Sequence, residues 1–458
     1  MKVLAIGFDG ASPNVIRWLG EELPTLHSFK KFGIWGQSIP PIPAQTPVAW
    51  TTFMTGKNPG KHGIFSFAMR KKGTYDREVI GPQMLRSGTL WQILRGAGKK
   101  VVKINVPMTD VEDAKETMIP GFLSPREGVP YPDEVRNKIK RKFGTGSIQG
   151  DIEMETLERV EADPDAFFQR IGEIMDEMAE ISLYLLQEEE WDFFMPVFMG
   201  LDRIQHFFWK YIDPTHPKYE CGKFGKFVKD HYIKIDKITS DFMKSIDEET
   251  AFIIVSDHGF CPIYAEVSLN NYLEESGFLL RKNGEVDLED SRAISYGYGD
   301  IWLNVRGREP NGVVMPGEEY ETTRNAIADC LKAITIDGKK PIKDVRRREE
   351  IWWGPYLNEA PDLTVFFNVG YQAARRPLIA SRSGKSEYLN ENPRWSGGHD
   401  GTHDPADVHG IFGIVGPGIP KEKEALVHLW DVAPTILELM GISIPPDMDG
   451  KPIELAEA

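Results

Sequence analysis

Short apolar runs, each ending in a polar residue, recur along this chain and restrict the folds that it can adopt. They cover residues 3–8, 100–106, 193–199, 251–256, 363–367 and 411–415. Apolar runs of this length are typical of strands buried on both faces, as in a parallel sheet. Between them, apolar residues recur at spacings of three and four, which indicates helices over about 164–190, 231–246, 323–334 and 429–440. The alternation predicts an α/β fold with a doubly wound, mostly parallel sheet.

Two stretches break this alternation. Residues 110–163 are rich in charged residues, Gly and Pro, and residues 271–390 mix short strand patterns with charged turns. We interpret both as insertions that form a cap over one end of the sheet. The core is then expected to consist of residues 1–109, 164–270 and 391–458.

Composition excludes several classes of protein. The 458 residues are 41% hydrophobic, which is too apolar for a disordered chain. The net charge of −15 argues against a partner that is a nucleic-acid polymer or an anionic membrane. The cysteines, Cys221, Cys261 and Cys330, show no paired spacing, so neither a disulfide framework nor a cysteine zinc site is expected. No signal peptide or membrane span is evident, which predicts a cytoplasmic protein; the sequence leaves its oligomeric state open.

Carboxylate and imidazole side chains follow the predicted core strands. Asp9 ends the first strand, and the adjacent pair Asp257 and His258 follows another. Asp202 and His206 are four residues apart, so a helix would place them on one face, as metal ligands or as an ordinary surface pair. Ligands bind beyond the carboxyl ends of the strands in open α/β sheets. Oxygen and imidazole donors without thiolates suit Zn²⁺ or Mn²⁺.

Thr46 is expected at the start of a short helix. Pro47 suits a first helical turn and Gly56 suits a helix end, which makes Thr46 the predicted N-cap residue. A hydroxyl in this place also lies where the free N–H groups of a helix attract phosphate. The local sequence does not choose between a cap and a reactive group.

The order of these residues resembles that of the alkaline phosphatase superfamily. The resemblance is closest to its type I phosphodiesterase/nucleotide pyrophosphatase branch and to microbial relatives described as phosphohydrolases or phosphomutases. It covers most of the chain through the segments 8–11, 46–50, 55–64, 256–259, 416–418 and 431–435, with Asp202 and His206. The resemblance implies an alkaline-phosphatase-like core and two divalent metal ions. Zn²⁺ is the preferred ion and Mn²⁺ is the alternative. One ion would be held by Asp9, Thr46, Asp257 and His258, and the other by Asp202, His206 and a C-terminal histidine.

Two histidines compete for that last position. His403 lies four residues before Asp407, the spacing that the resemblance to alkaline phosphatases implies, and His399 lies eight residues before it, the longer spacing of nucleotide pyrophosphatases. We predict His403 as the ligand and keep His399 as the alternative.

The resemblance also implies the chemistry. We expect a metal-dependent enzyme that cleaves small phosphate esters through a phospho-threonine on Thr46. A phosphodiester or nucleotide pyrophosphate is the favoured substrate, because no Arg or Lys is evidently committed to the extra charge of a monoester. Where nucleotide pyrophosphatases place a phosphate-binding asparagine shortly after a His-Gly-Ile turn, this chain has apolar side chains within residues 62–67, so Asn105 and Ser66 are the candidate substrate-binding residues.

Other functions remain open on the same fold. Transfer of the phosphoryl group to an alcohol would give a phosphomutase or phosphotransferase, and the same site could serve a phosphomonoesterase. An inactive binding protein is less favoured, since each expected ligand position holds a competent residue. A sulfatase would need Cys or Ser in place of Thr46.

Overall fold

The computed structural model of the chain describes residues 1–111, 116–153, 158–283, 285–336, 338–374 and 388–455. Its largest element is an eight-stranded sheet. In spatial order the strands are β20 (Lys423–His428), β2 (Ile34–Ile39), β19 (Gly410–Val415), β8 (Thr250–Val255), β1 (Lys2–Phe8), β7 (Phe193–Phe198), β5 (Val101–Val106) and β6 (Thr117–Pro120). All neighbouring pairs are parallel except those of β19, which runs antiparallel to both β8 and β2. The predicted mostly parallel sheet is confirmed.

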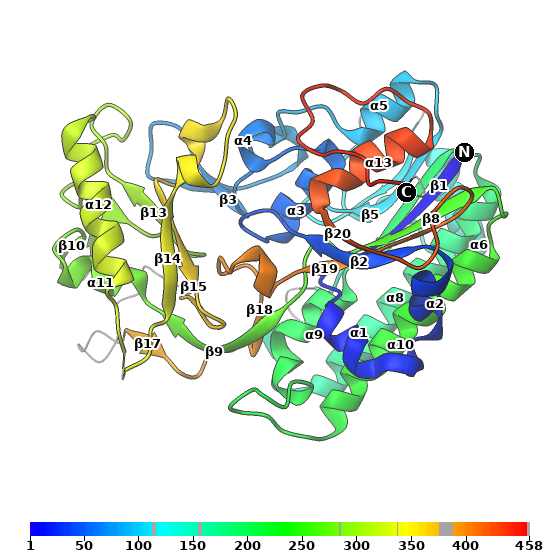
Figure 1. Cartoon of the computed structure of the whole chain (residues 1–458), viewed down its shortest axis with the longest axis horizontal. Helices are drawn as coiled ribbons and strands as arrows, with labels where there is room; N and C mark the ends of the chain where they lie inside the picture. The colour runs from blue at the N-terminus through cyan, green and yellow to red at the C-terminus, as the bar shows by residue number, and fades with distance from the viewer. Residues whose placement is uncertain (112–115, 154–157, 284, 337, 375–387, 456–458) are drawn as a thin grey trace.

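Helices cover both faces of this sheet (Figure 1). One face carries α1 (Pro13–Leu19), α2 (Pro24–Phe32), α6 (Asp133–Phe143), α8 (Pro164–Glu188), α9 (Gly200–Phe208) and α10 (Lys223–Lys244); the other carries α3 (Thr46–Thr55), α5 (Leu90–Gly96) and α13 (Val432–Leu439). Side chains of β1 alternate between the two layers: Leu4 and Ile6 join the first apolar cluster, and Val3 and Ala5 join the second. The doubly wound arrangement follows from this burial on both faces.

The second lobe is built on a smaller antiparallel sheet, at the left of Figure 1. Its strands are β12 (Ala293–Ile294), β13 (Asp300–Leu303), β15 (Leu363–Phe367) and β14 (Ile342–Arg347). Residues of α11 (Leu269–Glu275) and α12 (Glu318–Lys332) share its apolar cluster. The apolar run 363–367 therefore forms a strand, but one of this sheet and not of the main sheet. Strand β15 is buried at every position, as β7 and β8 of the main sheet are, so the run alone could not distinguish the two sheets.

The remaining regular elements are short. They are β3 (Ala68–Arg70), β4 (Arg77–Val79), α4 (Pro59–His62), β9 (Cys261–Val267), β10 (Leu280–Lys282), β11 (Glu285–Asp287), β16 (Gly370–Ala373), β17 (Leu389–Asn390) and β18 (Gly397–Gly398). Of these, β9 pairs with β16, β17 and β18 and so connects the second lobe to the loop that carries His399.

The stretch 110–163 differs from its expected role as a cap. Strand β6 forms the edge of the main sheet beside β5, and Val135 and Ile139 of α6 lie in the core cluster of that sheet. This part of the stretch extends the core. Among the residues that the structure describes, no helix combines the length and apolarity needed to cross a bilayer. A cytoplasmic location stays a prediction.

Candidate active site

Three strands of the main sheet end at one place and deliver three carboxylates there. Asp9 directly follows β1, Asp257 follows β8, and Asp202 lies in the first turn of α9, which begins right after β7. These strands are adjacent and parallel, so their carboxyl ends meet. All three carboxylates are at most 1% exposed.

Gly10 allows this convergence. Its φ is +73°, and a Cβ at this position would lie 2.8 Å from the Phe260 ring and 3.0 Å from the Asp202 Cα. Its N–H donates to Asp257 Oδ1 at 3.2 Å, and its carbonyl accepts from the Gln205 side chain at 2.7 Å. One residue without a side chain therefore links the ends of β1 and β8 to α9.

Thr46 is the first residue of α3 and is 2% exposed. The N-cap position belongs to Gln45, one residue before the predicted cap, and the Thr46 side chain is thereby freed from capping. Its Oγ1 lies 3.4 Å from Nε2 of His258. The structure therefore places this hydroxyl beside His258, next to the acidic cluster.

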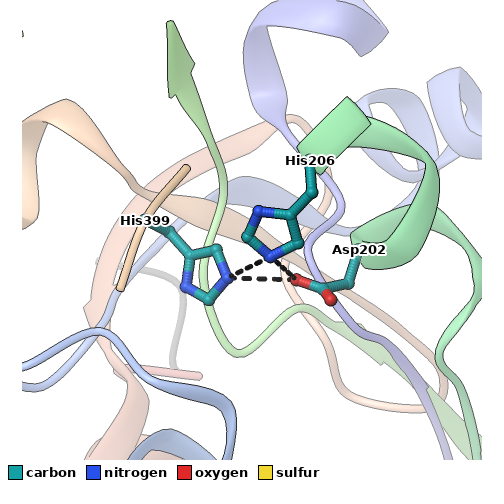
Figure 2. A group of neighbouring side chains, drawn as sticks. All are labelled: Asp202, His206 and His399. Carbon is teal, nitrogen blue, oxygen red and sulfur yellow. Dashed lines mark hydrogen bonds and ion pairs between the residues drawn. The ribbon is translucent and has the colours of Figure 1, made fainter. Parts of the chain in front are cut away.

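Asp202, His206 and His399 form one candidate metal-binding group, shown in Figure 2. Oδ1 of Asp202 lies 3.4 Å from His206 Nε2 and 3.1 Å from His399 Nε2, and the two Nε2 atoms are 3.2 Å apart. The Nδ1–H of His206 donates to the carbonyl of Gly397 at 3.1 Å, and that of His399 to the carbonyl of Ala44 at 2.6 Å. The Nε2 lone pairs then point at each other and at a carboxylate oxygen, an arrangement that a bound cation stabilises.

Asp9, Asp202 and His258 form the second candidate group. Nε2 of His258 lies 3.1 Å from Asp257 Oδ2 and 3.8 Å from Asp9 Oδ1, while its Nδ1–H donates to the carbonyl of Gly259 at 3.2 Å. The indole N–H of Trp50 donates to Asp9 Oδ2 at 2.8 Å, so Asp9 Oδ1 is the oxygen that can bind a metal ion. The two groups share Asp202, so they are contiguous.

Three buried carboxylate oxygens at this place have no hydrogen-bond partner as long as the facing imidazole Nε2 atoms carry no proton: Asp9 Oδ1, Asp202 Oδ1 and Asp257 Oδ2. Burying a carboxylate without a partner costs several kcal/mol, roughly, unless a cation balances it. All three oxygens face imidazole Nε2 atoms. Divalent metal ions with oxygen and nitrogen ligands therefore fit the residues present.

The pKa values of the cluster follow from burial and crowding of like charges. Burial, with Asp257 and Asp202 nearby, raises the pKa of Asp9 well above its usual range, and burial raises that of Asp257 to about 8. Burial lowers the pKa of His206 and of His258 to about 4. His206 and His258 are therefore neutral imidazoles at pH 7, the form that binds metals.

His399 behaves differently from the other two imidazoles. Although burial opposes its charged form, the hydrogen bond and charge of Asp202 raise the pKa of His399 to about 9. A proton on its Nε2 supplies positive charge at the point where the lone pairs converge. A metal ion would take the place of that proton.

The predicted ligand His403 is not part of either group. Its Nε2–H donates to the carbonyl of Tyr371 at 2.9 Å, so the ring is bound to the β16 strand of the second lobe. His399, the alternative, stands next to Asp202 and His206 instead. A turn lies between the two histidines, with Thr402 at φ +59°, so their side chains point in different directions. The spacing of the residues along the chain did not reveal this turn.

Asn105 is also unsuited to its predicted role in substrate binding. It is 1% exposed, and its side-chain amide donates to the carbonyls of Gly150 and Val197 at 2.9 and 3.0 Å. Its φ of +58° is a conformation that asparagine tolerates better than most residues. The Asn105 side chain therefore connects the end of β5 to the backbone of β7 and of the loop at Gly150. Ser66 lines a small, mainly apolar cavity together with Gln45 and Thr402.

Sequence reasoning missed Arg203 as a residue of the site. A charged residue beside an expected surface helix is ordinarily solvated, but the Arg203 side chain is only 15% exposed and its Nη1 lies 3.0 Å from Asp202 Oδ2. Adjacency to Asp202 was the available signal. Its other partner, Asp151, lies 52 residues away in sequence, so the pairing has no local signal.

The fold, with carboxylates, imidazoles and a hydroxyl at the carboxyl ends of its strands, defines an enzyme of the alkaline phosphatase superfamily. More narrowly, the chain belongs to the type I phosphodiesterase/nucleotide pyrophosphatase family, whose profile matches residues 3–406. Enzymes of this family hydrolyse phosphoesters with the help of metal ions.

Solved structures of similar fold cover almost the whole chain. Human ectonucleotide pyrophosphatase/phosphodiesterase 5 superposes with a TM-score of 0.60 at 16% identity, covering 98% of this chain and 97% of that one. Phosphonoacetate hydrolase from Sinorhizobium meliloti gives 0.57 at 17% identity over 94% of each chain. The murine ectonucleotide enzyme, as an inactive threonine-to-alanine variant in complex with AMP, gives 0.57 at 15% identity over 97% of this chain and 96% of that one.

Among characterised sequences, a protein of Myroides odoratus named calcium-transporting ATPase is 27% identical over 252 residues. That alignment covers 50% of this chain and 42% of the relative, so the chain matches less than half of that protein's length.

Proposed function

We propose that this enzyme hydrolyses small-molecule phosphodiesters through a covalent phospho-threonine on Thr46. The observation that carries the proposal is the position of Thr46 Oγ1, 3.4 Å from His258 Nε2 and at the buried acidic cluster. A hydroxyl at this place is either a helix cap or a reactive group, and Gln45 occupies the cap position.

Two divalent ions complete the proposed site, with Zn²⁺ preferred and Mn²⁺ suited to the same ligands. The ligand sets are Asp9, Thr46, Asp257 and His258 for one ion, and Asp202, His206 and His399 for the other. When bound, such ions lower the pKa of the threonine hydroxyl and offset the charge that develops on the phosphoryl group.

The chain's own groups then carry out two displacements. The Thr46 oxygen forms a bond to phosphorus, and the bond from phosphorus to one ester oxygen breaks, releasing an alcohol that takes up the threonine proton. Water then cleaves the bond between phosphorus and Thr46, which regenerates the hydroxyl and releases a phosphate monoester. Free N–H groups of the first turn of α3 are expected to assist by binding phosphoryl oxygens.

A phosphodiester is favoured over a monoester because of the charge of the site. Three carboxylates lie at its centre, and the guanidinium of Arg203 is already paired with Asp202 and Asp151. The two proposed metal ions would offset part of the substrate's charge, but the guanidinium that the described residues place at the site is not free to receive the further negative charge of a monoester. The complex of the murine relative with AMP supports a nucleotide-like product.

Trapping of the intermediate tests the proposal. Protein mixed with a nitrophenyl nucleotide diester and quenched in acid should yield a peptide with the nucleotidyl group on Thr46, detected by mass spectrometry. The Thr46→Ala variant should lack this adduct, while Thr55→Ala, which changes a buried threonine farther along α3, should keep it. An adduct on another residue would show that the nucleophile is elsewhere.

A further inference from the structure

Arg203 connects the candidate metal ligand Asp202 to a loop of the 110–163 stretch. Its Nη1 contacts Asp202 Oδ2 at 3.0 Å, and its Nε lies 3.0 Å from both carboxylate oxygens of Asp151. Nη2 of Arg203 also pairs with Asp151 Oδ2. The guanidinium additionally lies over the ring of Phe122, 5.2 Å from its centroid. Each nitrogen of this planar group thus contacts a carboxylate, and one face of the group lies against an aromatic ring.

Because of the contact with Arg203, the two carboxylate oxygens of Asp202 have different partners. Oδ1 faces His206 and His399, as Figure 2 shows, while Oδ2 is held by Arg203. A carboxylate whose second oxygen is fixed in this way cannot rotate about χ2 without losing a charge-assisted hydrogen bond. Partners of this kind orient metal ligands and strengthen metal binding.

Asp151 fixes the guanidinium in turn. Its side chain is 9% exposed and that of Arg203 is 15% exposed, so the pair is largely shielded from water. Burial alone would lower the pKa of Arg203, but Asp151 and Asp202 raise it above its ordinary value. The pair is also nearly neutral as a unit, so it orients Asp202 without adding net charge to the centre.

We propose that Asp151 and Arg203 are positioning residues that set the affinity of the metal ion held by Asp202, His206 and His399. This rests on the proposed function insofar as that function requires the ion. The stretch 110–163 thereby takes part in the site through one carboxylate, rather than by closing over it.

The competing role for Arg203 is direct contact with the substrate phosphate. The geometry favours positioning, because each nitrogen of Arg203 already donates to Asp151 or Asp202, which hold the guanidinium in place. A substrate phosphate would have to use the second N–H of Nη1 or Nη2, or compete with one of these carboxylates. The two roles differ in what they predict for protein without substrate.

The test measures metal affinity in the absence of substrate. Apo-protein prepared by chelation is titrated with Zn²⁺ against a competing chelator, and bound metal is counted by elemental analysis. The variants are Arg203→Ala, Arg203→Lys and Asp151→Asn. Arg136→Ala is the matched control, since Arg136 pairs with Asp133 on the exposed face of α6. The circular dichroism melting curve of each apo-protein reports folding.

We expect Arg203→Ala to weaken the binding of one of two Zn²⁺ ions about 10- to 100-fold and to leave the other unchanged. Arg203→Lys should recover only part of this loss, because an ammonium cannot bridge Asp151 and Asp202 as a planar fork does. Asp151→Asn should show a smaller loss in the same ion. In a His206→Ala background, Arg203→Ala should cause no further loss at that ion, because its binding site is already broken.

Three results would overturn the inference. The first is unchanged affinity for both ions with a raised KM, which would assign Arg203 to the substrate. The second is a lowered melting temperature with unchanged affinity, which would make the pair structural only. The third is an equal loss for both ions. Wild-type protein that binds no Zn²⁺ would instead contradict the proposed function, so the two failures are distinguishable.

Discussion

The imidazole ring of His399 lies parallel to that of His258, with centroids 3.5 Å apart and planes 13° apart. The two rings belong to different candidate metal groups, since Nε2 of His399 faces Asp202 Oδ1 while Nε2 of His258 faces Asp257 Oδ2. His399 thus stands at the junction of both groups. Its Nδ1–H bond to the carbonyl of Ala44 also ties it to the loop just before Thr46.

Replacement of His399 should therefore remove one metal ion. We expect His399→Ala to bind one Zn²⁺ fewer than the wild type, because the ion beside Asp202 loses one of its three ligands. His403→Ala is the matched control, since His403 donates to the Tyr371 carbonyl and should keep full stoichiometry. Elemental analysis of dialysed protein gives the answer. Loss of metal in His403→Ala alone would restore our original prediction from the sequence.

The sequence predicted the parts of this site that local pattern controls. Asp9, Asp202 and Asp257 follow buried strands, and buried apolar runs are easily recognised, so the place where the strands end was foreseeable. The four-residue spacing of Asp202 and His206 on a helix also sufficed to bring them together.

The errors arose where a side chain's partner lies far away in sequence. Asn105 follows the pattern of a polar residue at a strand end, yet the carbonyls of Gly150 and Val197 occupy its amide. Arg203 is largely buried and pairs with Asp151, a residue of a distant loop. Such pairings depend on how loops fold back on the sheet, and a single sequence contains no direct signal of them.

Metal removal should abolish hydrolysis. Three buried carboxylate oxygens without hydrogen-bond partners, on Asp9, Asp202 and Asp257, depend on a cation for compensation. We expect exhaustive chelation to eliminate turnover of a nitrophenyl diester, and Zn²⁺ or Mn²⁺ to restore it. Mg²⁺, which prefers all-oxygen ligands, serves as the control ion and should restore less activity. Full activity in protein shown to contain no metal would contradict this mechanism.

Thr46→Ala should separate chemistry from metal binding. Loss of the nucleophile should lower kcat by several orders of magnitude, roughly, as removal of covalent nucleophiles does in other hydrolases. The other proposed ligands of its ion, Asp9, Asp257 and His258, remain, so metal content should largely persist. Steady-state kinetics and elemental analysis on the same preparation measure both. Near-normal turnover would exclude Thr46 as the nucleophile.

His62 should make the fold sensitive to acid independently of the active site. It is fully buried at the end of α4, its Nδ1 accepts from the N–H of Ile64 at 3.2 Å, and its Nε2 lies 3.1 Å from Thr52 Oγ1. Burial lowers the pKa of His62 from 6.5 to about 3. Between pH 3 and pH 6.5 the unfolded chain therefore binds a proton at His62 more readily than the folded chain does. The contribution of neutral His62 to the free energy of unfolding is complete above pH 6.5 and is lost as the pH falls toward 3.

The expected effect of His62 is about 2 kcal/mol of unfolding free energy lost between pH 7 and pH 5, from about 1.4 kcal/mol per pH unit. Urea unfolding at both pH values should show this loss in the wild type. His62→Gln, which keeps a polar side chain but does not titrate, should be less stable at pH 7 and should lose about 2 kcal/mol less over the same interval. Equal losses in both proteins would show that other groups control acid unfolding.

The last prediction concerns the substrate class. The site presents three buried carboxylates, and the one guanidinium that we find beside them in the described part of the chain, Arg203, is neutralised by Asp151. Because a monoester carries one more negative charge than a diester near neutral pH, its binding at this centre should be less favourable. We therefore expect kcat/KM for a nucleotide nitrophenyl diester to exceed that for nitrophenyl phosphate at one pH and one metal loading. Thr46→Ala, assayed in parallel, controls for a contaminating phosphatase. A hundredfold preference for the monoester, about 2.7 kcal/mol of transition-state discrimination, would reverse the assignment, because it would require a basic side chain, beyond the proposed metal ions, that is free to bind the additional charge.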